Sequence, residues 1–348
     1  APNFKFIISW KGKRFNSCIH DIWMRGVRLH FIKVDLRLQL IQCPIKAIYK
    51  FIQLREFIAF YFDFFFPIFR TLDWHFFDFG SVWAGRVANP FWAPNKVQTV
   101  FDADLAFEGL AFKWEPKWST SNAFFNLGAF IISENYSAGR DQVDAGLFGY
   151  QLGYALKGED WSWISHFSNH YFLNVKNQLI TNAEKSAKVD PYSYPFDRYR
   201  GNTVFVDDPA LPADQRKYYF SNPYIILGFG SEIKKRVGPV EVLGFFEFNR
   251  NDAIRAQNAA HEIGSSIRWR VLQISASSIL KQTDSVFAAF TDSDTNGGGT
   301  DNAGYRYSIF LQPAKNVTLA LHRFIAKRGV DTVPRDFSGT HCDFSVSF

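Results

Sequence analysis

The stretch Phe148-Gly-Tyr-Gln-Leu-Gly-Tyr-Ala-Leu156 carries an apolar or aromatic side chain at every second position. Successive side chains of a β-strand point to opposite faces, so this stretch has one apolar face. From about Ser81 onward, segments roughly ten residues long repeat the alternation, and the last closes on Asp343–Phe348. Apolar faces toward lipid and polar faces toward a water-filled lumen are typical of a transmembrane antiparallel β-barrel, which is the predicted all-β fold class.

The connectors between these segments alternate short and long, as periplasmic turns and external loops do in such barrels. The last strand ends at the periplasm, so the connector before it must be external, and Ala326–Gly339 is long. The short connectors are Glu115–Asn122, Lys157–Asp160, Lys234–Pro239 and Pro313–Asn316. The long ones are Ala88–Glu108, Ser133–Ala145, Val175–Lys217, Asn249–His261, Phe290–Gly304 and Ala326–Gly339.

Alternation also predicts which side chains face lipid and which face inward. A large soluble all-β domain is the alternative, but its strands are usually shorter and lack outward belts of aromatic residues. The lipid-facing set is Leu110, Phe112, Trp114, Phe148, Tyr150, Leu152, Tyr154, Leu156, Val240, Val242, Phe246, Phe248, Val317, Leu319 and Leu321. The inward set includes Lys113, Gln151, Glu241, Glu247, Arg268, Arg270 and Arg306.

Composition agrees with interleaved rather than blocked apolar residues. Hydrophobic residues make up 47% and aromatic residues 18% of the chain, yet mean hydropathy is slightly negative. No run reaches the roughly 18–20 apolar residues of a membrane helix. The net charge of +6 is spread without a basic cluster, which favours a lumen or rim that handles anions over nucleic-acid binding. A start at Ala1 suits an exported protein whose leader has been removed.

The first eighty residues differ from the rest. Strands are expected at Lys5–Trp10, Gly26–Val34, Leu36–Ile41 and Ile45–Ile52, but the turns between them lack Gly, Asn and Asp. A departure of this stretch from the natural sequence is one hypothesis, and peptide mass spectrometry would test it. Cys18 and Cys43 could form a disulfide in an oxidising periplasm, whereas Cys342 is expected to act as a small hydrophobic residue.

Two passages resemble the putative porin family of Gram-negative outer membranes. One is Ser81–Phe91, ending Gly-Arg-Val-Ala-Asn-Pro-Phe, followed by Asp102-Ala-Asp-Leu-Ala-Phe-Glu-Gly109; the other is Phe287–Thr300 with Gly304 beyond it. The resemblance implies one outer-membrane barrel domain over residues 1–348, in which 1–80 form the first strands. Twelve strands from Ser81 onward and about four before it give sixteen, with fourteen or eighteen as alternatives. Between Val271 and Leu272 the apolar residues change from odd to even positions, which indicates either a tight turn or a bulge in one long strand.

With that count, residues 88–108 form the third external loop, which folds into the barrel and narrows it in the general porins that the chain resembles. Asp102, Asp104 and Glu108 would then face Arg86 across a pore constriction. Opposed acidic and basic groups sort ions and orient solutes. The alternative is that the carboxylates cap loop turns. The predicted lumen wall carries Lys113, Arg268, Arg270, Lys281 and Arg306.

These features predict a porin for ions and small hydrophilic solutes in the outer membrane of a Gram-negative bacterium. A homotrimer follows from the resemblance, with lipid and lipopolysaccharide as partners and no nucleic acid, cofactor, metal or catalytic residue. A substrate-specific channel is an alternative that inward aromatic residues would favour, and an outer-membrane hydrolase is another. His166 and His170 are interpreted as wall residues. The Asp292–Thr300 loop has the oxygen atoms of a calcium site, or those of an ordinary turn.

Overall fold

The computed structural model describes residues 6–7, 71–76, 79–133, 144–180, 200–212 and 215–346. Contacts divide the chain into two units, Ala1–Phe6 with Asp73–Phe348, and Ile7–Leu72. The description below concerns the first unit. Cys18, Cys43, the strands expected before residue 53 other than 6–7, and Phe348 lie outside the described residues.

Nearly all regular structure is β-strand. Among the described residues no helix has the length and apolar character needed to cross a membrane. The strands are β1 (Phe6–Ile7), β2 (Thr71–Phe76), β3 (Gly80–Ala88), β4 (Ala106–Trp114), β5 (Ser121–Ser133), β6 (Ala145–Lys157), β7 (Trp161–Leu173), β8 (Val204–Val206), β9 (Tyr218–Phe220), β10 (Tyr224–Val237), β11 (Val240–Asn251), β12 (Ala259–Trp269), β13 (Leu272–Lys281), β14 (Asn302–Ala314), β15 (Val317–Arg328) and β16 (Arg335–Val346). Short 3-10 helices are η1 (Pro94–Lys96), η2 (Ala288–Phe290) and η3 (Thr295–Gly297).

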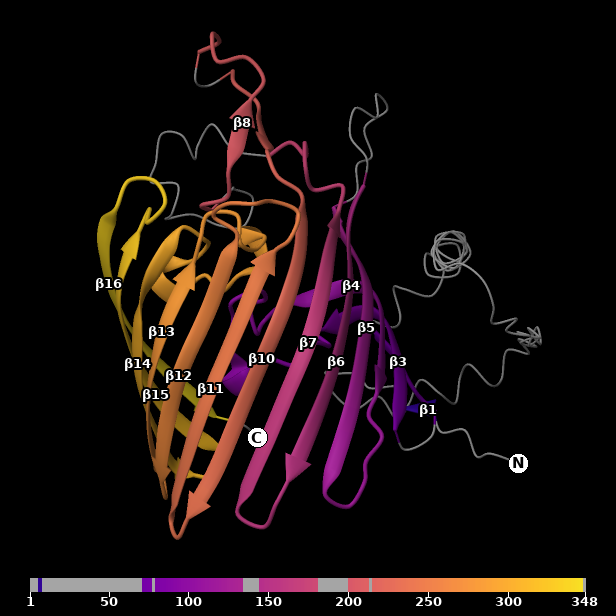
Figure 1. The fold of residues 1–348 in the computed structure, drawn as a ribbon, viewed down its shortest axis with the longest axis vertical. Coiled ribbons are helices and arrows are strands. Elements are labelled where there is room, and N and C mark those ends of the chain that lie inside the picture. The colour runs from indigo at the N-terminus through magenta and orange to yellow at the C-terminus, as the bar shows by residue number, and fades with distance from the viewer. Residues whose placement is uncertain are drawn as a thin grey trace, which may run out of the picture. The chain divides into compact units, whose positions relative to one another are not determined.

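One antiparallel sheet joins the strands in chain order, while β8 and β9 form a separate hairpin inside the long connector between β7 and β10. The sheet curves so that β14–β16 lie behind β10–β13 in Figure 1. From β3 onward it contains twelve strands, as predicted after Ser81. Closure of the sheet and a total of sixteen strands remain predictions, because residues 1–5, 8–70 and 77–78 lie outside the described part.

The turns follow the predicted alternation of connector lengths. β10 and β11 are joined at Gly238, whose φ of 58° suits glycine, and Val237 pairs directly with Val240. The parity flip before Leu272 is a tight turn, since Trp269 pairs with Leu272 and Arg270 adopts a φ of 52°. Arg270 is therefore a turn residue, which corrects its predicted place on the lumen wall.

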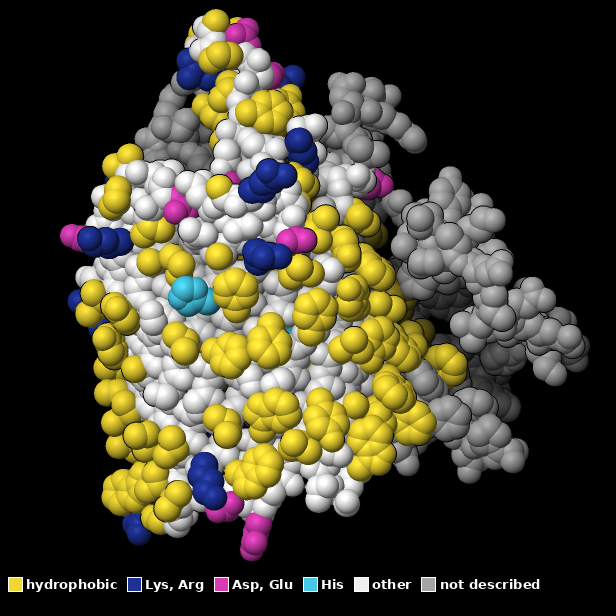
Figure 2. Space-filling view, viewed as in Figure 1, with side chains coloured by type: hydrophobic (Ala, Val, Ile, Leu, Met, Phe, Trp, Pro, Cys, Tyr) yellow, Lys and Arg dark blue, Asp and Glu magenta, His cyan; other side chains and the backbone are white. Residues whose placement is uncertain are grey.

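Outer and inner faces separate cleanly along most strands. Leu152, Val242 and Phe246 are exposed, whereas Gln151 and Glu247 on the alternate positions are buried. The predicted lipid-facing orientation agrees with this pattern. Figure 2 shows hydrophobic side chains spread over the middle of one face, with most charged groups toward its two ends. That distribution matches an apolar band between two polar rims.

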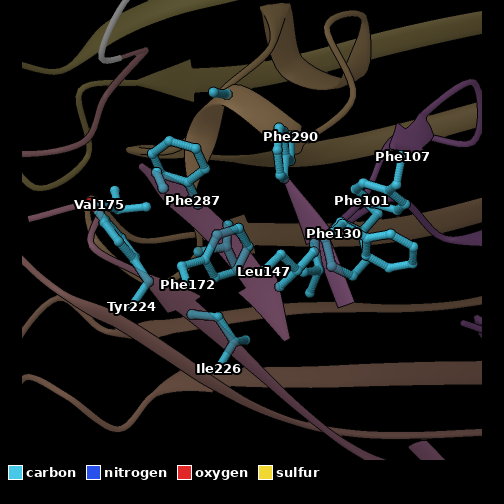
Figure 3. Close-up of a cluster of buried hydrophobic side chains, with 14 of the residues drawn as sticks. Phe101, Phe107, Phe130, Leu147, Phe172, Val175, Tyr224, Ile226, Phe287 and Phe290 are labelled. Atoms are coloured by element: carbon cyan, nitrogen blue, oxygen red, sulfur yellow. The ribbon is translucent and has the colours of Figure 1, made fainter. Parts of the chain in front are cut away.

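Part of the inner face is buried and closed to water. A buried cluster fills it near the end with the long connectors, where side chains from strands and two inward-folded loops meet (Figure 3). Phe101 comes from the β3–β4 connector, and Phe287 and Phe290 come from the β13–β14 connector. They pack on Phe107, Phe130, Leu147, Phe172, Tyr224 and Ile226 of the strands. Aromatic residues therefore form an internal core as well as outward-facing positions.

Candidate channel constriction and adjacent cavity

The β3–β4 connector, residues 89–105, lies on the inner face and is held there by Gln151 of β6. The Gln151 amide accepts a hydrogen bond from the Trp92 backbone N–H at 2.8 Å and donates one to the Trp92 carbonyl at 2.7 Å. The same amide oxygen accepts from Asn126 Nδ2 at 2.9 Å, and its nitrogen lies 3.0 Å from His166 Nδ1. Gln151 is 1% exposed, so these contacts account for its burial.

Two acidic side chains of neighbouring strands fix the tip of the loop. The Asn95 backbone N–H donates to Glu232 of β10 at 2.7 Å. The Thr99 hydroxyl donates to Glu247 of β11 at 2.6 Å and accepts a hydrogen bond from Asn249 Nδ2 at 3.0 Å. These bonds place the middle of the loop, like its start, on the inner face of the sheet.

A glycine on β6 makes room for the loop. Gly149 lies on the inner face beside Gln151, and a Cβ atom there would lie 2.6 Å from Phe91 Cζ and 2.7 Å from His170 Nδ1. The Phe91 and His170 rings meet edge to face with centroids 4.6 Å apart. Because such a Cβ would overlap both rings, glycine allows the loop to approach the wall closely.

The two inward loops also hold each other. The Asp102 backbone N–H donates to the Phe290 carbonyl at 2.8 Å. The Phe290 ring lies 6.5 Å from the Phe101 centroid and 5.8 Å from the Phe107 centroid. The β13–β14 loop is itself fixed by the buried Asp284 carboxylate, which accepts hydrogen bonds from Thr203, Asn222 and Tyr224.

The carboxylates of the two loops lie close enough to influence one another. Burial raises the pKa of Asp102 above its ordinary value, and the charges of Asp292, Asp104 and Asp294 raise it further. A hydrogen bond from the Asp104 backbone N–H, at 3.1 Å, acts in the opposite direction. The acidic group thus combines the predicted pair Asp102 and Asp104 with two carboxylates from the second loop.

Basic groups lie on the inner faces of β13, β14 and β16. Arg306 forms an ion pair with Glu262 of β12, and His341 Nδ1 lies 3.8 Å from Asp294 Oδ2. The Lys281 side chain is fully buried, and its Nζ has no hydrogen-bond partner among the described residues. Lys281 and Arg306 thus lie on the inner face of the sheet, as predicted. His341 and Glu262 lie on the same face.

Arg86 and Glu108 do not lie where they were predicted. They are opposite each other in the β3–β4 register, and both are exposed. The neighbouring pair Val87 and Phe107 is buried in the internal cluster, so Arg86 and Glu108 point to the outer face. The inward orientation predicted for Arg86 is corrected by this register, and Glu108 shares the parity of outward Leu110.

A cavity of about 640 Å³ lies between the loop and strands β4–β7. Its apolar walls include Trp92, Phe124 and Ile164. Lys113, on the predicted inward position of β4, also lines it, and its ammonium lies 4.7 Å from the Trp83 ring centroid. Arg268, the remaining predicted wall residue, is exposed outside this cavity and donates from Nε to Gln273 at 2.9 Å.

Three neighbouring strands bring a serine, a histidine and an aspartate into line, a set that the sequence did not reveal. Ser308 Oγ lies 2.8 Å from His322 Nδ1, and His322 Nε2 lies 3.2 Å from Asp343 Oδ2. However, Ser308 is 3% exposed, and the paired strands use their backbone N–H groups in the sheet. The burial of Ser308 limits the access to its hydroxyl that acyl transfer requires.

The two remaining sequence candidates are structural. His166 and His170 are buried inner-face residues in ring contact with Trp92, Phe91 and Phe101. In the Asp292 loop, the carboxylate accepts hydrogen bonds from the backbone N–H groups of Asp294 and Thr295 and from the Thr295 hydroxyl. Its oxygens therefore serve the turn.

Comparison with known proteins supports the sequence resemblance. Residues 66–237 match the family model described as "Putative porin". No curated protein matches significantly. Among solved structures, "Outer-membrane expressed OmpT of Vibrio cholerae" is similar at 9% identity and a TM-score of 0.42, over 79% of this chain and 78% of that chain. The motif Phe287–Thr300 lies beyond the region that the family model matches. The resemblance to the putative porin family is thus confirmed for residues 66–237, which run from before β2 to the end of β10 and include the inward β3–β4 loop.

Proposed function

We propose that this protein is an outer-membrane porin of a Gram-negative bacterium, through which ions and small hydrophilic solutes diffuse passively. The observation that carries the proposal is the loop 89–105, hydrogen-bonded to Gln151, Glu232 and Glu247 on the polar face of a long antiparallel sheet. The proposed role of a loop held in this way is to narrow the lumen. The porin family match over residues 66–237 includes this loop.

The path of the solute follows from what fills the inner face. The aromatic cluster occupies the inner surface between β3 and β12 at the loop end. Asp294 and Asp343 remain largely exposed beside β14–β16, with His341 partly exposed. The β13–β14 loop contacts the wall of β14–β16 through Asp294 and His341. The proposed passage therefore runs past the exposed groups beside this contact, where Asp294, Asp343 and His341 line it.

Planar-bilayer recording of the purified protein tests this function. Reversal potentials in asymmetric salt should show stable, ohmic channels with a selectivity set by the charges of the passage. A membrane that stays non-conducting after insertion of folded protein would contradict the proposal. The same result would leave a plugged barrel, an enzyme or a purely structural protein as the explanation.

Partners follow from the membrane location. The proposed surroundings of the outer face are lipid and lipopolysaccharide, and the proposed assembly is a homotrimer without cofactor or catalytic step. Support for contact with lipid is the run of exposed apolar residues on that face, such as Leu152, Phe246 and Ile274. Cross-linking in native membranes checks the assembly, since a ladder that stops at dimer would contradict a trimer.

A substrate-specific channel is the second candidate. One observation favours it over an unselective pore: aromatic side chains line an inner cavity, where Trp92 and Phe124 meet edge to face with centroids 6.1 Å apart. Small-molecule sites commonly combine apolar walls with a few polar groups.

A further inference from the structure

The cavity beside the inward loop has walls suited to an apolar body. Trp92 and Phe124 form an aromatic corner, and Ile164, Ala155 and Val97 extend the apolar lining. The volume of about 640 Å³ falls within the range of sites for small organic ligands. Glu115, Lys117 and Asn122 also line the cavity, and they lie at the β4–β5 turn. The cavity therefore reaches the end of the sheet with the short turns.

Its polar lining combines positive charge with neutral hydrogen-bonding groups such as Asn126 and His166. Lys96, Lys113 and Lys117 line the cavity, against the carboxylates of Glu115 and Glu247. Glu247 already accepts the Thr99 hydroxyl, and the Gln151 amide is occupied by Trp92, Asn126 and His166. The three ammonium groups of the lining can donate to an anionic solute.

Lys113 is placed to receive a negative group. It lies on the inner face of β4, and its ammonium approaches the Trp83 ring at 4.7 Å. Among the described residues it forms no ion pair, and Glu115 is the carboxylate whose charge acts on it. An ammonium partly withdrawn from water beside an apolar wall gains from a charged acceptor at its tip.

We propose that the cavity is a binding site for small organic carboxylates with a ring-sized apolar body, with the carboxylate at Lys113 and the ring packed against the corner formed by Trp92 and Phe124. The inference rests on the proposed porin function, because the solute reaches the cavity from lumen water. It adds a substrate class to that function. A simple ion or a purely hydrophilic solute would leave the aromatic corner unused.

Benzoate is the probe, with benzamide and acetate as its uncharged and ringless counterparts. Calorimetric titration of folded protein in neutral detergent micelles should show saturable benzoate binding, with the other two at least about tenfold weaker. Lys113→Met should weaken benzoate binding about tenfold, since it keeps the apolar stem and removes the charge. Lys113→Arg should restore binding, and heat-modifiable electrophoresis verifies folding of each variant.

Lys234→Met is the matched control, because Lys234 lies on the inner face of β10 at the same end of the sheet but outside the cavity. It should bind benzoate like the parent. Equal affinities for benzoate and benzamide, or an unchanged affinity in Lys113→Met, would overturn the inference even when bilayer conductance is normal. Benzoate binding by a protein that never conducts would instead contradict the proposed porin function.

Discussion

Replacing Gln151 with Leu should release the inward loop from its wall. Leucine has a similar size but leaves the Trp92 backbone N–H, the Trp92 carbonyl and the Asn126 amide without the partners they have in the parent. Each buried polar group without a partner costs about 1–3 kcal/mol. At the lower end, the three together disfavour the docked loop by about 3 kcal/mol, or roughly a hundredfold in its opening equilibrium.

Amide hydrogen exchange read by mass spectrometry measures that equilibrium. Peptides covering residues 89–105 should exchange about a hundredfold faster in Gln151→Leu, because exchange follows the open population. Peptides from β14 and β15 should keep their parent rates. Gln273→Leu is the matched control, since Gln273 is an inner-face glutamine that contacts Arg268 and not the loop. Unchanged protection of 89–105 in Gln151→Leu would refute the assignment of Gln151 as the clamp.

The remaining predictions concern selectivity and topology. The double variant Asp102→Asn, Asp104→Asn should shift reversal potentials toward anions, since two carboxylates leave the passage. Arg86→Gln, on the outer face, should leave the reversal potentials unchanged. Equal effects of the two changes would contradict the assignment of the aspartates to the inner face and of Arg86 to the outer face. Cation preference should fall with acidification at a higher pH than for a solvated aspartate, because the raised pKa of Asp102 means that it gains its proton earlier; a fall confined to the ordinary range would argue against it. Protease added to intact cells should cut within Val175–Lys217, and protection there would reverse the topology.

Alternation predicted the outer face well because membrane strands repeat one simple rule along the chain. The alternation failed to orient β3, because both faces of this strand carry apolar side chains. Trp83 and Val87 lie on one face, and Val82 and Ala84 lie on the other. There only the register with β4 decides the orientation, and it places Arg86 outside. Pairing across strands is a tertiary property, so the residues of β3 alone could not supply it.

The site was predicted in part for a similar reason. Asp102 and Asp104 stand in a recognisable motif, and the inward position of their loop was expected only through resemblance to general porins. The clamp by Gln151 joins residues 59 apart in sequence, and nothing in its own strand marks it as more than an inward polar residue. The inward position of the β13–β14 loop was not expected. Its two phenylalanines, Phe287 and Phe290, stand among small residues, and this pattern was a signal of burial.

The contacts of the inward loop also constrain the order of assembly. Asn95 and Thr99 bond to strands 137 and 148 residues further along the chain. Contacts at such separation form only after the intervening chain has been organised, because closing long loops costs entropy before any contact forms. The loop therefore reaches its final position late, after β10 and β11 have joined the sheet. Until then the inner face lacks this loop, so the proposed lumen is wider before β10 and β11 have joined the sheet than it is afterwards.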